Sequence, residues 1–148
     1  MITQEADLRI EAVAVRTGLT KRAIRYYEEL GLVSAVSRSE SGQRLYNADD
    51  IRRLTRIREL KEGIGLSLGE IQALLDADMV RDRLRERYWA TDDIGERLAA
   101  LRESVAAVSS QLQVITRKRA ALAALQVEYE DRLARLRQAM DEIAAGDR

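Results

Sequence analysis

The sequence has 148 residues, of which 46 % are hydrophobic and 34 % charged, a composition typical of a soluble, mainly helical protein. It contains no cysteine and no histidine, which excludes disulfides, thiolate metal sites and the usual general base of enzymes at neutral pH. Proline is also absent, so long helices are expected. Because the net charge is zero, only the distribution of charge along the chain is informative.

The charges are distributed unevenly along the chain. Between Arg16 and Lys61 there are eleven basic and six acidic residues, whereas from Asp76 onward there are thirteen basic and fourteen acidic ones. No apolar run is long enough to span a membrane, and residues 1–9 do not resemble a signal peptide. We therefore expect a cytoplasmic protein with a basic N-terminal segment and no membrane partner.

Two short amphipathic segments separated by a glycine predict a helix-turn-helix. The first segment begins near Ile10 and ends at Gly18, a residue type that commonly follows the last turn of a helix. Thr20 fits the N-cap of a second helix, which ends before Gly31. Its inward face is expected to comprise Ala23, Ile24 and Tyr27, and its outward face Lys21, Arg22 and Arg25.

A polar stretch between apolar residues follows the second helix. Val33 and Val36 precede this stretch, Leu45 and Tyr46 follow it, and a Ser-Gly pair lies inside it, which predicts a β-hairpin with its turn at 40–42. One arginine lies near each side of that turn, an arrangement suited to binding phosphates. These two arginines are Arg38 and Arg44.

The helical period returns at Ala48, after Asn47 or Asp49 as the cap. The apolar face of this helix comprises Ile51, Leu54, Ile57 and Leu60. Gly63 and Gly65 interrupt it, and Ser67 with Glu70 forms a capping box for a further helix through Leu75. The arginines on the outer faces, Arg52, Arg53 and Arg56, are expected to be solvated, whereas Arg58 is the best exception and a possible DNA contact.

The tail of the chain carries a regular heptad pattern. Apolar residues recur at alternating spacings of four and three from Ile94 to Ile143, which predicts a coiled coil of about 50 residues, or about 75 Å. So narrow an apolar stripe needs a partner helix. We expect dimer contacts from Leu98, Leu101, Val105, Val108, Leu112, Ile115 and Leu122. Two polar residues interrupt the stripe, Arg119 and Gln126, which either fix the register or mark where the chain turns back.

The segment 10–75 resembles the DNA-binding domain of the MerR family of bacterial transcription regulators. The strongest stretch is 17–32, TGLTKRAIRYYEELGL, followed at the family spacing by RSESGQRLY over 38–46 and GLSLGEI over 65–71. The resemblance implies a winged helix-turn-helix, a long antiparallel dimerisation helix and binding to a promoter dyad. Many members twist and bend an overlong promoter spacer so that RNA polymerase can use it.

Carried over by position, the resemblance implies DNA contacts from the recognition helix and from the wing: Arg22, Arg25, Tyr26 and Tyr27 in the helix, and Arg38 and Arg44 in the wing. The predicted set of DNA-binding residues also includes Thr20, Lys21, Gln43 and Arg58. The chain departs from the family pattern at Gln43, where the wing commonly has a tyrosine, and at Ala35 and Val36, where prolines often occur. Metal-sensing members carry cysteines beside the long helix and this chain has none, so we expect no metal site and no cofactor.

The predicted fold class is mainly α, a winged helix-turn-helix followed by a long coiled-coil dimerisation helix. We expect the DNA-binding domain over 8–76, a connector over 77–92 and the coiled coil over 93–145. Trp89, beside Tyr88, is expected to pack where the domain joins the coil, rather than to line a ligand pocket.

The predicted function is that of a homodimeric, sequence-specific transcription regulator on a promoter inverted repeat. Its partners are double-stranded promoter DNA, a second copy of the chain and, indirectly, RNA polymerase. The alternative is a coiled-coil adaptor whose helix-turn-helix docks a protein. An enzyme is not expected, because the sequence has no glycine-rich phosphate loop and no carboxylate pair in a pocket-like context. The target genes, the direction of regulation and any small-molecule effector stay open.

Overall fold

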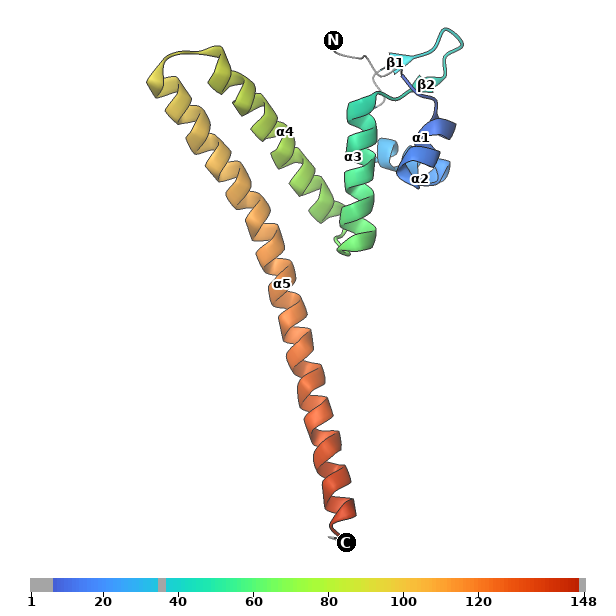
Figure 1. Cartoon of the computed structure of the whole chain (residues 1–148), viewed down its shortest axis with the longest axis vertical. Helices are drawn as coiled ribbons and strands as arrows, with labels where there is room; N and C mark the ends of the chain where they lie inside the picture. The colour runs from blue at the N-terminus through green and yellow to red at the C-terminus, as the bar shows by residue number, and fades with distance from the viewer. Residues whose placement is uncertain (1–6, 35–36, 147–148) are drawn as a thin grey trace. The chain divides into compact units, whose positions relative to one another are not determined.

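The computed structural model describes residues 7–34 and 37–146, which form two compact units divided between Asp76 and Ala77 (Figure 1). The chain runs through α1 (Ile10–Thr17), α2 (Lys21–Glu29), β1 (Ser37–Arg38), β2 (Arg44–Leu45), α3 (Ala48–Arg58), the π-helical turn η1 (Glu59–Gly63), α4 (Leu68–Ala90) and α5 (Ile94–Ala144). The expected fold class is confirmed. No helix among the described residues is long and apolar enough to cross a membrane.

The helix-turn-helix of the first unit follows the local signals in the sequence. Gly18 ends α1 in the left-handed region, at φ +70°, and its amide donates to the Ala14 carbonyl at 2.9 Å. The Thr20 hydroxyl accepts a hydrogen bond from the Ala23 amide at 3.1 Å, which caps the N-terminus of α2. The turn between the two helices is therefore fixed at both ends.

The predicted hairpin is present, and it is short. β1 and β2 pair antiparallel with Arg38 opposite Arg44, and the turn closes through the Gly42 amide, which donates to Ser39 at 2.8 Å. Leu8 forms a β-bridge to Tyr46, so the segment before α1 is held against the end of β2. The predicted flank at Val36, and Ala35 beside it, lie outside the described residues.

The core of the first unit lies among α1, α2, α3, η1 and the start of α4. Its most deeply buried side chains are Val13, Ile24, Leu32, Tyr46, Leu54, Ile57 and Ile71. Arg53 differs from expectation: its guanidinium donates to the Leu32 carbonyl and is partly buried, so it holds the segment after α2 against α3 rather than facing solvent.

Two helix boundaries depend on capping boxes. Asn47 caps α3 with Asp50 as the reciprocal partner, both hydrogen bonds being 2.9 Å long. Ser67 and Glu70 form the predicted box at the start of α4, with both bonds at 3.1 Å. The predicted end at Leu75 is wrong, since α4 continues to Ala90. Neither glycine nor proline occurs over 70–90 to stop it.

In the second unit, side chains of α4 and α5 contact each other. The Gln111 amide donates to Asp78 at 2.8 Å, Arg87 pairs with Glu103 at 3.0 Å, and Ala100 on α5 is only 1 % exposed. α5 is one uninterrupted helix of 51 residues, so the alternative in which the chain turns back near Arg119 is wrong.

Trp89 does not pack as expected. Its ring makes an edge-on contact with Tyr88, with ring centroids 5.1 Å apart, yet Trp89 is 70 % exposed. Tyr88 is half-buried instead, with the Arg97 guanidinium 5.2 Å from its ring centroid. Tyr88, rather than Trp89, therefore makes the packing contact, with Arg97.

Replacing Gly18 by Ala should destabilise the first unit by about 2 kcal/mol. About 1 kcal/mol comes from the left-handed backbone, and about 1 kcal/mol from a lost hydrogen bond. That bond joins the Arg58 guanidinium to the Thr17 carbonyl at 2.9 Å, and a Cβ at Gly18 would lie 2.2 Å from the donating nitrogen. Urea unfolding measures the difference.

The matched control is Gly31→Ala, because Gly31 also has a positive φ, +73°, but its Cβ would meet nothing within 4 Å. In an Arg58→Ala background, Gly18→Ala and Gly31→Ala should lower the free energy of unfolding by the same amount. Equal costs in the wild-type background would show that Arg58 does not stabilise the end of α1.

Candidate nucleic-acid interface

The outer face of α2 is polar and exposed along its whole length. Lys21, Arg22, Arg25 and Tyr26 are all exposed, whereas Ile24 and Tyr27 on the opposite face are buried. The spacing of these residues on the helix separates the two faces, as the sequence predicts. The helix therefore presents three cations and one aromatic ring to solvent.

The DNA contact predicted for Tyr27 is not compatible with its position. Its side chain is 3 % exposed and lies in the core, with the Lys61 ammonium 5.7 Å from the ring centroid. Of the two adjacent tyrosines only Tyr26 is on the surface. Tyr27 lies three residues after Ile24, so the two side chains share the buried face of α2, whereas Tyr26 lies on the exposed face.

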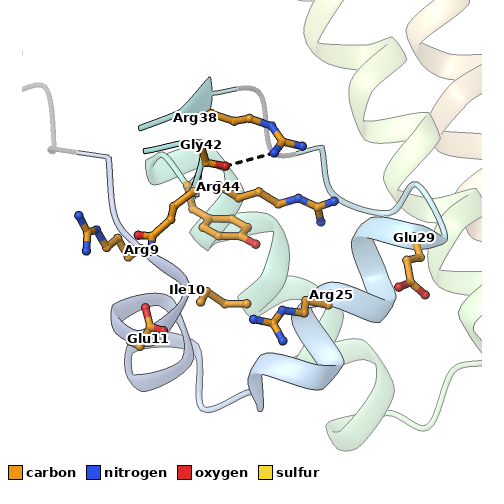
Figure 2. Close-up of a pocket in the computed structure, with 10 residues that line it drawn as sticks. Arg9, Ile10, Glu11, Arg25, Glu29, Arg38, Gly42 and Arg44 are labelled. Carbon is orange, nitrogen blue, oxygen red and sulfur yellow. Dashed lines mark hydrogen bonds between the residues drawn. The ribbon is translucent and has the colours of Figure 1, made fainter. Parts of the chain in front are cut away.

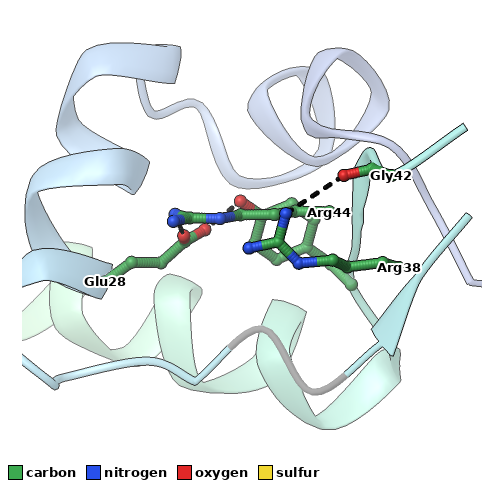
Figure 3. Close-up of polar contacts among 5 residues, drawn as sticks. Glu28, Arg38, Gly42 and Arg44 are labelled. Carbon is green, nitrogen blue, oxygen red and sulfur yellow. Dashed lines mark hydrogen bonds and ion pairs between the residues drawn. The ribbon is translucent and has the colours of Figure 1, made fainter.

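The hairpin is joined to α2 through the carboxylate of Glu28 (Figure 3). Glu28 forms an ion pair with Arg44 and accepts a hydrogen bond from the Tyr46 hydroxyl, and its side chain is only 6 % exposed. Burial and this hydrogen bond raise the pKa of Tyr46 well above its ordinary value, so the hydroxyl stays protonated and donates. Arg44 is therefore oriented by an internal partner while almost half of its side chain remains exposed.

An open cavity of about 440 Å³ lies between α2, the hairpin and the segment that leads into α1 (Figure 2). Four arginines and two glutamates line it: Arg9, Arg25, Arg38, Arg44, Glu11 and Glu29. Arg38 is exposed and donates to the Gly42 carbonyl at 3.2 Å, which holds it beside the turn. Guanidinium groups outnumber carboxylates in this lining, and arginine can bind phosphate oxygens through paired donors, so the cavity has the chemistry that an anion would need.

A second hollow on the outer face of α2 adjoins this cavity. Arg25 and Glu29 line both, and Arg22 and Tyr26 line only the second. A positively charged surface therefore continues from the hairpin onto α2. We call it the basic face, and it comprises Arg9, Arg22, Arg25, Arg38 and Arg44. Lys21 lies outside both hollows and pairs with Glu11 at 3.5 Å.

Three other predicted residues are placed as follows. Gln43 is exposed in the hairpin and also lines the cavity, and Thr20 lines the second hollow and uses its hydroxyl oxygen to cap α2. Arg58 donates to the Thr17 carbonyl and pairs with Glu62 at 3.1 Å, so its guanidinium joins α1 to α3. Its contact with DNA stays a prediction.

Sequence reasoning missed two residues of the site. Arg9 precedes α1 as an isolated charge, and only the pairing of Leu8 with Tyr46 brings it to the cavity. Glu28 has the spacing of an ordinary helix-surface acid, and its burial depends on the return of β2. Among the residues that the structure describes, no group of three or more acidic side chains could hold a metal ion.

The heptad stripe of α5 is exposed in the single chain. The seven residues predicted to dimerise are between 39 % and 65 % exposed. A second stripe on the same helix is partly covered instead, and it comprises Arg97, Ala100, Ser104, Ala107, Gln111, Val114 and Lys118. These two stripes divide α5 into a side next to α4 and an uncovered apolar seam.

Comparison with known proteins identifies the family of the first unit. Residues 8–78 match the MerR HTH family of regulatory proteins. The HTH-type transcriptional regulator YfmP of Bacillus subtilis (strain 168) is 39 % identical over 111 residues, which cover 75 % of this chain and 79 % of that protein. The HTH-type transcriptional regulator CueR of Salmonella typhi is 42 % identical over 69 residues, or 47 % of this chain and 49 % of that protein.

A crystal structure of a MerR-family transcriptional regulator from Bacillus cereus aligns with 85 % of this chain and 79 % of its own, at 25 % identity and a TM-score of 0.45. The helix-turn-helix and its relatives define a DNA-binding transcriptional regulator. The chain belongs to the MerR family.

Replacing Glu28 by Gln should destabilise the first unit by about 1–2 kcal/mol, because a charge-assisted contact to Arg44 is lost while the amide oxygen still accepts from Tyr46. The neighbouring Glu29→Gln is the matched control, since Glu29 is exposed and its change should stay within about 0.5 kcal/mol. Urea unfolding of both variants tests this. Equal stabilities would contradict the role assigned to Glu28.

Proposed function

We propose that this regulator binds a promoter inverted repeat as a homodimer and distorts the DNA between the two half-sites. The observation that carries the proposal is the basic face, in which arginines from α2, the hairpin and the segment before α1 converge on one open cavity. Side chains of α2 contact the bases directly, and side chains of the hairpin contact phosphates. RNA polymerase is affected indirectly, through the shape of the promoter.

The outer face of α2 suits the major groove of DNA. An α-helix with its side chains is about 10–12 Å across, and the groove is about 12 Å wide. Lys21, Arg22 and Arg25 lie in the N-terminal half of α2, the part of a recognition helix that contacts base edges. Arginine and lysine bind guanine there, so these residues give the sequence preference, with Tyr26 beside them.

The hairpin and the residue before α1 suit the DNA backbone. Arg38 and Arg44 occupy paired positions on β1 and β2, and Arg9 lines the same cavity. Phosphate contacts fix the orientation of a protein on DNA without reading its sequence. Gln43, exposed in the hairpin, stands where the family commonly has a tyrosine, and its backbone contact is weaker than or different from that of a tyrosine.

The apolar seam of α5 supports homodimerisation. An exposed stripe of leucine, isoleucine and valine along one helix is stable in water only when another helix covers it. We assign the DNA-binding domain to 8–76, the connector to 77–92 and the coiled coil to 93–145. The seam runs from Ile94 to Ile143, and the residues assigned to the dimer contact are Leu98, Leu101, Val105, Val108, Leu112, Ile115 and Leu122.

The charges beside the seam favour antiparallel helices. A parallel pair in register would place Arg119 opposite the partner's Arg119 in the core. On the flanks it would place Arg97 beside the partner's Arg102, and Arg132 beside the partner's Arg137. Like charges at these positions oppose association, whereas an antiparallel pair sets Arg119 opposite an apolar residue.

Two reading heads related by a two-fold axis meet successive major grooves about 34–36 Å apart. A promoter whose elements are spaced differently must be twisted or bent to fit a rigid dimer, at a cost of order 1–6 kcal/mol. Phosphate contacts from the hairpin arginines of both subunits offset this cost. The DNA between the half-sites is then distorted without being contacted.

Replacing Arg38 by Ala should weaken binding and flatten its dependence on salt, because Arg38 is an exposed hairpin arginine assigned to phosphate contacts. Each phosphate neutralised contributes about −0.9 to the slope of log affinity against log salt, so a dimer that loses one contact in each half-site changes its slope by about 1.8. Gel shifts at several salt concentrations measure this.

Arg56→Ala is the matched control, because Arg56 is an exposed arginine of α3 paired with Glu59 at 3.5 Å and lies outside the basic face. It should leave the slope unchanged. If Arg38→Ala and Arg56→Ala gave the same slope as the wild type, the basic face would not be the DNA-binding surface.

A further inference from the structure

We propose that the two α5 helices of the dimer pair in one particular antiparallel register, with Leu101 opposite Leu133 of the partner subunit. The proposal rests on the homodimer of the proposed function and adds which residues meet. The occupant of the seam is thus a second copy of this chain. The register of the second copy along the seam follows from the length of the seam and from the charges on the flanks of the seam.

The length of the seam limits the register to two choices. Registers that keep the heptad pattern differ by seven residues. With Leu101 opposite the partner's Leu133, every seam residue from Ile94 to Met140 is covered and only Ile143 is left over. With Leu101 opposite the partner's Met140, only Ile94 is left over. Each further shift leaves at least three seam residues in water, which opposes association.

The structure shows which flank of the seam is open to a partner. One flank of the N-terminal half carries Ser104, Gln111 and Lys118, which are half-buried, and Gln111 contacts Asp78 of α4. The other flank is fully exposed, and it comprises Arg102, Ser109, Thr116, Ala123 and Glu130. We call this set the open flank. Residues on it face the open flank of the partner in an antiparallel pair.

Charges on the open flank separate the two remaining registers. The proposed register sets Arg102 opposite the partner's Glu130, and the two-fold axis makes this attraction twice. The other register sets Arg102 opposite the partner's Arg137, which repels twice. Arg102 has no ion-pair partner in the described part of its own chain, and Glu130 accepts only a neutral hydrogen bond from Gln126 at 2.7 Å. Both are therefore available for a partner.

One contact acts against the proposed register. It brings Lys118 near the partner's Lys118 on the flank next to α4. This contact occurs once, on the axis, and Lys118 already has an interaction within its own chain. The repulsion within a single lysine pair at a half-exposed position costs less free energy than the proposed register gains over the other one. That gain consists of two Arg–Glu attractions made and two Arg–Arg repulsions avoided.

The proposed register places Thr116 next to the partner's Thr116 at the two-fold axis, which a thiol-specific reagent can detect. The chain has no cysteine, so each introduced one is unique. Ser109→Cys, Thr116→Cys and Ala123→Cys are made in the full chain and treated with a short bifunctional maleimide. Thr116→Cys alone should form covalent dimers. Ser109→Cys and Ala123→Cys should do so only when the two proteins are refolded together.

The competing register gives the opposite pattern. There Thr116→Cys is inert alone and cross-links with Ala123→Cys, an outcome that would overturn the proposal. Sedimentation equilibrium of the same variants separates this failure from that of the homodimer. Monomers throughout would refute dimerisation itself, whereas dimers with the competing pattern would refute only the register.

A charge reversal provides an independent test of the same contact. Glu130→Arg should weaken the dimer about ten-fold, because two attractions become two repulsions, and Arg102→Glu in the same chain should restore it. Asp131→Arg changes the charge equally on the outer side of the helix and should have little effect. Equal weakening by Glu130→Arg and Asp131→Arg, or no restoration, would contradict the assigned pairing.

Discussion

The carboxylate of Glu28 connects the two parts of the reading head. It lies on α2 but is almost fully buried, because the end of the hairpin covers it with Arg44 and Tyr46. Arg44 and Tyr46 are therefore held against α2, the helix that also carries Arg25. The main chain of Tyr46 also pairs with Leu8, which brings Arg9 to the same cavity. The arrangement of the basic face thus depends on one buried acid.

A rigid connection between hairpin and helix has a functional consequence. Separate DNA contacts increase affinity most when the protein does not have to order itself on binding. In this unit the turn between α1 and α2, the hairpin and the start of α3 are each fixed by hydrogen bonds within the protein. The first unit is consequently preorganised, and in the proposed dimer the deformation between the two half-sites therefore falls on the DNA.

Sequence reasoning succeeded where local chemistry decides the structure. Gly18, Thr20 and the Ser67–Glu70 pair act within three or four residues, so their roles could be predicted. It failed where partners are distant in sequence. The partners of Arg53 and Arg58 are 21 and 41 residues away, and no spacing along the helix indicates them. The exposure of Trp89 was missed because α4 was expected to end at Leu75, whereas the helix continues past Trp89 to Ala90.

The central claim is that a rigid dimer reads two half-sites on one face of the DNA. The most direct measurement compares the affinity of the protein for its selected inverted repeat with its affinity for the same repeat carrying two extra central base pairs. The insertion rotates one half-site by about 70°, given about 10–10.5 base pairs per turn. The account predicts that affinity falls to that of a single half-site. Unchanged affinity for the lengthened site, or equal affinity for one half-site and for the whole, would contradict it.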